Sequence, residues 1–308
     1  MSAACPLCRG TDTVRWRAAP DHVSEERFEL RRCPACDFAF TWPPPADLQR
    51  YYPAFYRRYG RGSAGLLQRV QQGRARRWAR AFDRPGRCLE IGSGEGWMLA
   101  AIRDLGWRVV GLERTATSAA FARHVQGLSM LVGSLEAIRP DARFELIVLH
   151  HVLEHLPDPA GTLLACRRLL APGGRIVVAV PNFASWQRAF AGPYWLHLDV
   201  PRHLGHFTPR SLRYAFSLAG LHLERLSFVS WEYDAFGWIE SVLNRLGFPL
   251  NTLLRVLQHD PRLPATSATS ISALALAMLL LLPALALALA SWVARRGAAM
   301  EAWATAGG

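Results

Sequence analysis

Lysine is missing from this sequence altogether, so arginine supplies all 36 basic residues. With 24 acidic residues, the formal net charge is +12, which ordinarily indicates nucleic acid or an anionic membrane as a partner. Codon bias can also raise arginine usage, so the charge alone does not select nucleic acid. Charged residues are missing as well from positions 263–294, which marks a separate apolar segment.

The N-terminus, from Met1 to Pro6, lacks the basic and apolar regions of a signal peptide. We therefore expect the body of the chain to be cytoplasmic. In that compartment, paired thiols hold metal more often than they form a disulfide. Two of the six cysteines, Cys88 and Cys166, stand alone in apolar surroundings and are expected in the core.

Two C-P-x-C knuckles contain the other four cysteines, which are Cys5, Cys8, Cys33 and Cys36. Four thiolates at this spacing suit one tetrahedral Zn²⁺ ion. Because the four thiolates fill the coordination shell, the zinc is expected to be structural rather than catalytic. The pattern predicts a small zinc-ribbon-like module over residues 1–42.

Residues 43–84 are expected to form a stiff proline-rich linker followed by a basic helix. Apolar residues recur at helical spacing between Leu66 and Phe82, with arginines around them. One interpretation is a solvated helix that packs on the main domain. The other is a basic surface that faces anionic lipid or a substrate phosphate.

From residue 85 to about 235, apolar strands alternate with helical stretches, which predicts an α/β fold with a mostly parallel, doubly wound sheet. The first strand, 87–91, runs into a turn with glycine at 92, 94 and 96. The second strand ends at Glu113, 21 residues after Gly92, where a carboxylate can accept hydrogen bonds from both hydroxyls of a ribose. Ligands bind such sheets at the carboxyl ends of the strands, so this turn is the expected small-molecule site.

These motifs, together with the 144–159 run FELIVLHHVLEHLPDP and the 169–182 run LLAPGGRIVVAVPN, resemble the class I S-adenosylmethionine-dependent methyltransferases. The resemblance implies a seven-stranded Rossmann-like sheet whose last strand is antiparallel. It also implies glycines beneath the methionine part of S-adenosyl-L-methionine, Glu113 on its ribose, and Ser134 or the Leu135 backbone near its adenine. The expected cofactor-binding residues are Glu90, Gly92, Ser93, Gly94, Gly96, Glu113, Ser134, Leu135 and His150.

Candidate bases follow two strands: His150, His151, Glu154 and His155 after the 144–149 strand, and a polar segment from Trp195 to His206 after the next one. The zinc knuckles and this fold also resemble sugar C-methyltransferases that carry a His-Glu-His run, of which only His203 is kept here. We expect His203 as the first choice for a base, with His155 and His151 as the other catalytic candidates.

Other interpretations of these polar residues stay open. Arg202 could hold a carboxylate or phosphate of the acceptor. The segment could be a purely structural loop, and Glu154 with His155 could simply fix a turn. A second metal site is a further alternative, with the ligands His197, His203 and His206.

Residues 236–296 form an apolar helical segment that is expected to associate with a membrane. Its Ile271–Val293 run is long enough to cross a bilayer, with Pro283 inside it and two arginines after it. Residues 297–308 fall where the last strand of the sheet is expected, so a true span would put one end on the wrong face. A hairpin bent at Pro283, an in-plane helix and buried soluble helices remain alternatives.

The sequence therefore predicts an S-adenosylmethionine-dependent methyltransferase with structural zinc at the cytoplasmic face of a membrane. Its acceptor is expected to be a small molecule, a glycan or a lipid-linked compound, methylated on oxygen or carbon. One alternative is an RNA methyltransferase that grips phosphates with the zinc module and the basic helix. Another is a module that binds the cofactor but is catalytically inactive.

Overall fold

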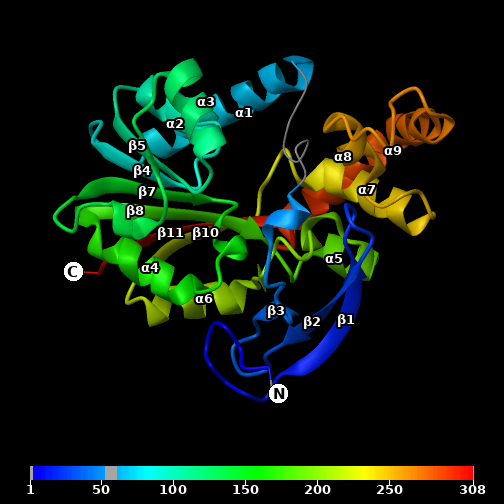
Figure 1. Cartoon of the computed structure of the whole chain (residues 1–308), viewed down its shortest axis with the longest axis horizontal. Coiled ribbons are helices and arrows are strands. Elements are labelled where there is room, and N and C mark those ends of the chain that lie inside the picture. The colour runs from blue at the N-terminus through cyan, green and yellow to red at the C-terminus, as the bar shows by residue number, and fades with distance from the viewer. Residues whose placement is uncertain (1–2, 53–60, 308) are drawn as a thin grey trace.

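The computed structural model describes residues 3–52 and 61–307 and contains two β-sheets (Figure 1). The larger sheet has seven strands in the spatial order β10-β11-β8-β7-β4-β5-β6. Their bounds, in chain order, are β4 (Arg87–Ile91), β5 (Arg108–Glu113), β6 (Met130–Val132), β7 (Phe144–His150), β8 (Leu170–Pro181), β10 (His222–Ser227) and β11 (Ala299–Thr305).

The strands from β4 to β8 run parallel, whereas β11 is antiparallel to both of its neighbours, β8 and β10. The predicted α/β fold, with a seven-stranded sheet and one antiparallel strand, is confirmed. The central strands are apolar on both faces because helices cover both faces.

Two hydrophobic cores lie on opposite faces of this sheet. On one face, α1 (Arg61–Ala79), α2 (Trp97–Arg103) and α3 (Ala116–Gln126) contribute apolar side chains such as Trp78 and Leu99. On the other, α4 (Pro159–Arg168) and α6 (Pro209–Leu218) contribute Leu163 and Phe216. In Figure 1, α1–α3 lie above the sheet and α4 and α6 below it.

The smaller sheet pairs three N-terminal strands with a strand from much later in the chain. Its order is β1 (Val14–Pro20), β2 (Arg27–Arg32), β3 (Ala39–Trp42) and β9 (Gly205–His206). Ala39 of β3 pairs with His206, and Phe38 packs its ring 4.9 Å from that of Phe207. The N-terminal module is therefore joined to the main body by strand pairing and by a shared core.

The basic helix α1 packs on the main sheet. Trp78 is fully buried, and its indole N–H donates to the Glu301 carboxylate, which also accepts a hydrogen bond from Arg77. Arg74 pairs with Glu232. Part of the predicted linker, residues 53–60, lies outside the described residues. Two arginines of the basic stretch, Arg74 and Arg77, thus form ion pairs within the chain.

A helical insert separates β10 from β11. It contains α7 (Asp234–Arg245), α8 (Thr252–Leu257) and α9 (Ala268–Val293), and it extends away from the main sheet (Figure 1). α9 is a single helix of 26 residues that includes Pro283, so the predicted hairpin bent at that proline is wrong. It packs small residues such as Ala273, Ala284 and Ala288 against α7 and α8.

Candidate functional site

The glycine turn after β4 has a backbone that only glycine adopts readily. Gly92, Gly94 and Gly96 have φ values of +66°, +54° and +79°. A Cβ at Gly92 would lie 2.5 Å from Val152 Cγ2, and one at Gly96 would lie 2.4 Å from Leu128 Cδ1. A Cβ at Gly94 would meet nothing within 4 Å. The two outer glycines thus allow tight packing, and the middle one leaves an open surface.

Glu113 ends β5 beside this turn because β4 and β5 are paired in parallel register. Its Oε2 accepts a hydrogen bond of 2.9 Å from the Gly94 N–H, and its Oε1 accepts one of 3.0 Å from the Thr115 N–H. The carboxylate is therefore fixed at the mouth of the turn, pointing toward the glycines.

Glu90 lies just before the turn and is buried. Burial raises the pKa of its carboxyl to about 8, and the nearby charge of Glu113 acts in the same direction. Among the described residues, its buried Oε2 has no hydrogen-bond partner. An unsatisfied buried acid beside a bare glycine surface fits a ligand that brings a hydrogen-bond donor.

The remaining cofactor candidates surround the same edge of the sheet. Ser93 is buried, with its Oγ 3.9 Å from the Met130 sulfur. Ser134 is exposed and donates to the Glu136 carboxylate, and Leu135 starts the short helix η2 (Leu135–Ala137). His150 ends β7, with its ring centroid 4.7 Å from that of His151.

The three predicted catalytic histidines come together around Glu154, although His203 is separated from the other two by about fifty residues. His203 Nε2 lies 3.9 Å from Glu154 Oε1 and 3.8 Å from Asp199 Oδ2. Its other ring nitrogen, Nδ1, is 3.0 Å from the His197 carbonyl oxygen. A proton on Nδ1 would satisfy that carbonyl, and Nε2 lies on the side of the two carboxylates.

His151 and His155 complete this cluster. His151 Nδ1 lies 3.3 Å from Glu154 Oε1, and its ring packs 4.5 Å from that of Tyr233. His155 Nδ1 lies 2.9 Å from the Arg202 carbonyl oxygen, and its ring is 4.6 Å from that of His203. The cluster lies next to the glycine turn, because the intervening Val152 is the residue that crowds Gly92.

Comparisons with known proteins agree with this geometry. Residues 57–226, more than half of the chain, match the family model Methyltransf_23, described as a methyltransferase domain. The chain belongs to this methyltransferase family. It is accordingly an S-adenosylmethionine-dependent methyltransferase, as predicted.

Curated relatives of this methyltransferase include ubiquinone biosynthesis O-methyltransferases. One from Rhodopseudomonas palustris (strain BisB18) is 30% identical over 38% of this chain and 48% of its own length. One from Xylella fastidiosa (strain M23) is 30% identical over 47% of this chain and 65% of its own length. The chain thus spans about half to two thirds of these relatives.

A solved structure shares the fold. It is the complex between the Haloferax volcanii Trm112 methyltransferase activator and a methyltransferase, with a TM-score of 0.50 and 18% identity. The match covers 80% of this chain and 95% of that one. At this level of identity, the likeness supports the architecture alone.

Arg202 of the methyltransferase does not face an acceptor, so that interpretation is wrong. Its side chain is fully buried, and the guanidinium donates to Asp199 Oδ1 at 2.8 Å, to the Tyr51 carbonyl at 2.7 Å and to Asp21. Burial alone would raise the pKa of Asp199, but Arg202, His203 and His22 lower it well below its usual range. Sequence reasoning missed Asp21, because its partner lies 181 positions away and no local pattern links them.

The N-terminal module also holds the backbone of the segment that contains His203. Thr41 Oγ1 donates to the His203 carbonyl at 2.8 Å, and the Thr41 N–H donates to the Leu204 carbonyl at 3.0 Å. From the main domain, the Leu204 N–H donates to the Glu154 carbonyl at 2.8 Å. His203 is therefore positioned jointly by both parts of the chain.

The alternative metal site from His197, His203 and His206 is not formed. The ligating atoms of His197, His203 and His206 do not come within 4.8 Å of one another as a set. In the described part of the chain, two groups bring metal-ligating atoms within 4.8 Å of one another. They are the four cysteines and the set Glu154, His155 and His203.

The four cysteine thiols converge as the spacing predicts. Cys5 Sγ lies 3.6 Å from Cys36 Sγ, and Cys8 Sγ lies 3.5 Å from Cys33 Sγ. Sulfurs bound to one tetrahedral zinc would be about 3.8 Å apart, so the set needs little adjustment. The neighbouring thiol of Cys36 lowers the pKa of Cys5 to about 5, which favours the thiolate form that binds metal.

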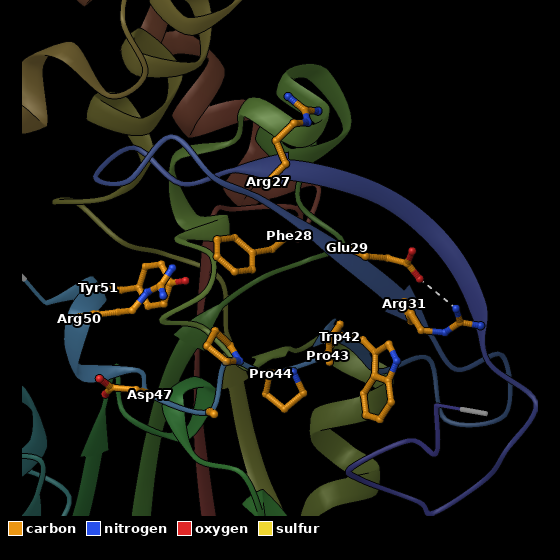
Figure 2. Close-up of a pocket in the computed structure, with 12 residues that line it drawn as sticks. Arg27, Phe28, Glu29, Arg31, Trp42, Pro43, Pro44, Asp47, Arg50 and Tyr51 are labelled. Atoms are coloured by element: carbon orange, nitrogen blue, oxygen red, sulfur yellow. Dashed lines mark hydrogen bonds and ion pairs between the residues drawn. The ribbon is translucent and has the colours of Figure 1, made fainter. Parts of the chain in front are cut away.

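A cavity of about 860 Å³ lies on the N-terminal sheet, apart from the glycine turn and the histidine cluster (Figure 2). Phe28 and Tyr51 pack edge to face at 5.4 Å at one end, and Glu29 pairs with Arg31 at 2.9 Å near the other. Its lining residues are Arg27, Phe28, Glu29, Arg31, Trp42, Pro43, Pro44, Pro45, Ala46, Asp47, Arg50 and Tyr51. None of the predicted cofactor or catalytic residues lines it.

Proposed function

We propose that this methyltransferase methylates an oxygen or carbon of a small-molecule, glycan or lipid-linked acceptor at the cytoplasmic face of a membrane. The observation that carries the proposal is the contact between the glycine turn and the histidine cluster. Gly92 packs against Val152, which lies between His151 and Glu154. A methyl donor over the turn and a base in the cluster would therefore be neighbours, as an in-line transfer requires.

The residues of the turn fit S-adenosyl-L-methionine, which supplies an electrophilic methyl group when it is bound. Gly92, Gly94 and Gly96 would lie beneath its methionine part, and Glu113 would accept hydrogen bonds from its ribose hydroxyls. Glu90, whose buried Oε2 has no partner among the described residues, would gain one from a donor on the cofactor. Ser93, Ser134, Leu135 and His150 complete the proposed binding set.

His203 is the proposed general base. Its Nδ1 lies 3.0 Å from the His197 carbonyl oxygen, which fixes the ring, and in this proposal its Nε2 takes a proton from an acceptor hydroxyl or carbon acid. Glu154 and Asp199, both within 4 Å of Nε2, would stabilise the imidazolium that forms. His151 and His155 would orient Glu154 and the acceptor.

Two further parts of the proposal concern the metal ion and the acceptor atom. The four cysteines would hold a structural zinc ion, because they leave no coordination position open for substrate. O-methylation is favoured by the printed name of the relatives, which are O-methyltransferases of ubiquinone biosynthesis.

Titration calorimetry with S-adenosylmethionine tests the cofactor site. We expect Gly94→Asp and Glu113→Ala to abolish or strongly weaken binding, because the first fills the open surface and the second removes the ribose acceptor. Asp141→Ala, which removes an exposed acid that pairs with Arg139 rather than with a proposed cofactor residue, serves as the matched control. Unchanged binding by both site variants would contradict the proposed cofactor site.

Transfer of radiolabelled methyl groups into fractionated lipid, glycan and RNA pools tests the acceptor. Label in the lipid or glycan pool is the expected result. Label in RNA alone would favour the RNA methyltransferase alternative. Cofactor binding without any transfer would favour an inactive binding module.

A further inference from the structure

The helical insert lies between two strands that are hydrogen-bonded neighbours. β10 ends at Ser227, which pairs with Glu301 near the start of β11, so the chain leaves and re-enters the sheet at the same end of these two strands. A segment that starts and ends on one side of a bilayer must cross it an even number of times. Within the insert, all of which is described, only α9 is long and apolar enough to cross.

Both ends of α9 are also tied to the protein body. Near its start, Arg262 donates to the Val23 carbonyl of the N-terminal module. At its end, the Trp292 indole donates at 2.7 Å to Asp234 Oδ2 of α7, and Arg296, just after the helix, donates at 3.1 Å to the Ala184 carbonyl of the main domain. These contacts hold the two ends on the same side as the catalytic domain.

The exposed surface of α9 is nonetheless apolar from Leu274 to Val293. Only 17% of the most hydrophobic 18-residue stretch of α9 is buried. The side chains of Met278, Leu279 and Leu282 are each about three-quarters exposed. Several polar groups of the insert face inward, as in the buried ion pair between Arg255 and Asp260 at 2.9 Å. An exposed apolar face of this extent indicates a partner surface rather than water.

The C-terminal end of α9 has the composition of a membrane interface. Trp231 is 70% exposed and stacks edge to face on Trp292 at 4.6 Å. Arg295 and Arg296 are exposed directly after the helix. Aromatic side chains with arginines are typical of the lipid headgroup level, and the arginines complement anionic headgroups.

We propose that α9 lies in the plane of one leaflet of an anionic membrane as a monotopic anchor and does not span it. The exposed leucine face would enter the acyl region, while α7 and α8 cover the opposite side. Tyr233, two residues from the exposed Trp231, packs its ring 4.5 Å from that of His151. This step rests on the proposed function. It places the histidine cluster near the lipid headgroups, where the cluster could reach the polar head of an acceptor that has a lipid tail.

Flotation of the full-length protein with vesicles tests the anchor. We expect binding to vesicles of phosphatidylcholine with phosphatidylglycerol, and weaker binding to phosphatidylcholine alone. The double variant Met278→Glu, Leu282→Glu should lower the bound fraction by about tenfold, because two charges would enter the acyl region. Val14→Glu with Val125→Glu, two exposed apolar sites away from the insert, is the control and should float normally.

Three results would overturn the proposal. They are no binding of the unsubstituted protein to either vesicle, an equal loss of binding in the control variant, and a double variant that changes the oligomeric state but not the vesicle-bound fraction. The last would assign the apolar face to a second copy of the chain. S-adenosylmethionine binding is measured on every variant. A protein that binds the cofactor but never floats refutes the anchor and leaves the methyltransferase proposal intact.

Labelling in sealed, inside-out membrane vesicles tests the topology. Cysteines introduced singly as Ala265→Cys and Ala294→Cys lie at exposed positions beside the two ends of α9. An impermeant maleimide should label both from the cytoplasmic side, above the background of the unsubstituted chain. Labelling of only one end would demonstrate a spanning helix and overturn the proposal.

Discussion

Arg202 and Asp21 form an ion pair in which both side chains are fully buried, although they lie 181 positions apart. Asp21 belongs to the N-terminal module, whereas Arg202 directly precedes the proposed base. The same guanidinium binds Asp199, whose other oxygen lies 3.8 Å from His203 Nε2. The N-terminal module thus helps to position the segment that contains the proposed base.

Asp21→Asn should destabilise the protein by about 3 kcal/mol, because it removes one partner of a buried pair while Asp199 still compensates Arg202. Urea unfolding measures the loss. Asp141→Asn, in the exposed pair with Arg139, should leave the unfolding midpoint unchanged. Equal midpoints for Asp21→Asn and the unsubstituted protein would show that the buried pair contributes nothing.

His203→Asn should lower kcat by about 10²–10⁴-fold if the imidazole is the general base. The affinity for S-adenosylmethionine should not change, because His203 lies outside the glycine turn. His124→Asn, on the exposed side of α3, is the matched control. A lower cofactor affinity with unchanged kcat would assign His203 to binding instead.

Alanine substitutions at Gly96 and Gly94 should separate the role of the turn in packing from its role in cofactor binding. Gly96→Ala should destabilise the fold markedly, because its Cβ would clash with Leu128 and its φ is left-handed. Gly94→Ala meets open space, so backbone strain of about 1 kcal/mol is its main structural cost, while cofactor affinity should fall. Thermal unfolding and calorimetry on both variants make the comparison, and a reversed pattern would contradict the assigned roles.

Glu90 should make the cofactor-free protein less stable as pH rises from about 4.5 to about 8. Its pKa in the folded state is raised to about 8, so the folded state keeps a proton that the unfolded chain has released. Stability therefore falls by up to about 1.4 kcal/mol per pH unit in this window. The difference in unfolding free energy between the unsubstituted protein and Glu90→Gln isolates the effect, and a difference that does not vary with pH would disprove it.

Removal of zinc should impair methyl transfer more than cofactor binding. The metal would organise the module whose β3 pairs with β9 and whose Thr41 holds the His203 backbone. Cys36→Ser, or a chelator, should release zinc and lower kcat, whereas Cys166→Ala should retain the metal. Metal analysis with calorimetry checks this, and full activity in a zinc-free protein would exclude a positioning role.

Local patterns predicted much of this molecule. The glycine turn, Glu113 and the two cysteine knuckles each follow from a few neighbouring residues, because a tight turn or a metal knuckle has fixed spacing. The antiparallel last strand followed from the family resemblance.

The features that the sequence did not predict depend on contacts between residues that are far apart in the chain. A lone arginine in a polar loop looks the same whether it faces a substrate or, like Arg202, is enclosed by Asp21 and Tyr51. Similarly, nothing in residues 205–206 indicates that they pair with β3. The course of α9 could be inferred only once β10 and β11 were seen to be adjacent.

The position of β11 affects the order of assembly. This strand fills the gap between β8 and β10, yet the ribosome makes it only after α7, α8 and α9. Until it emerges, two strands of the sheet have unpaired edges that are prone to association with other chains. If the apolar helix settles on the bilayer during this interval, the membrane would shelter the nascent protein before its sheet can close.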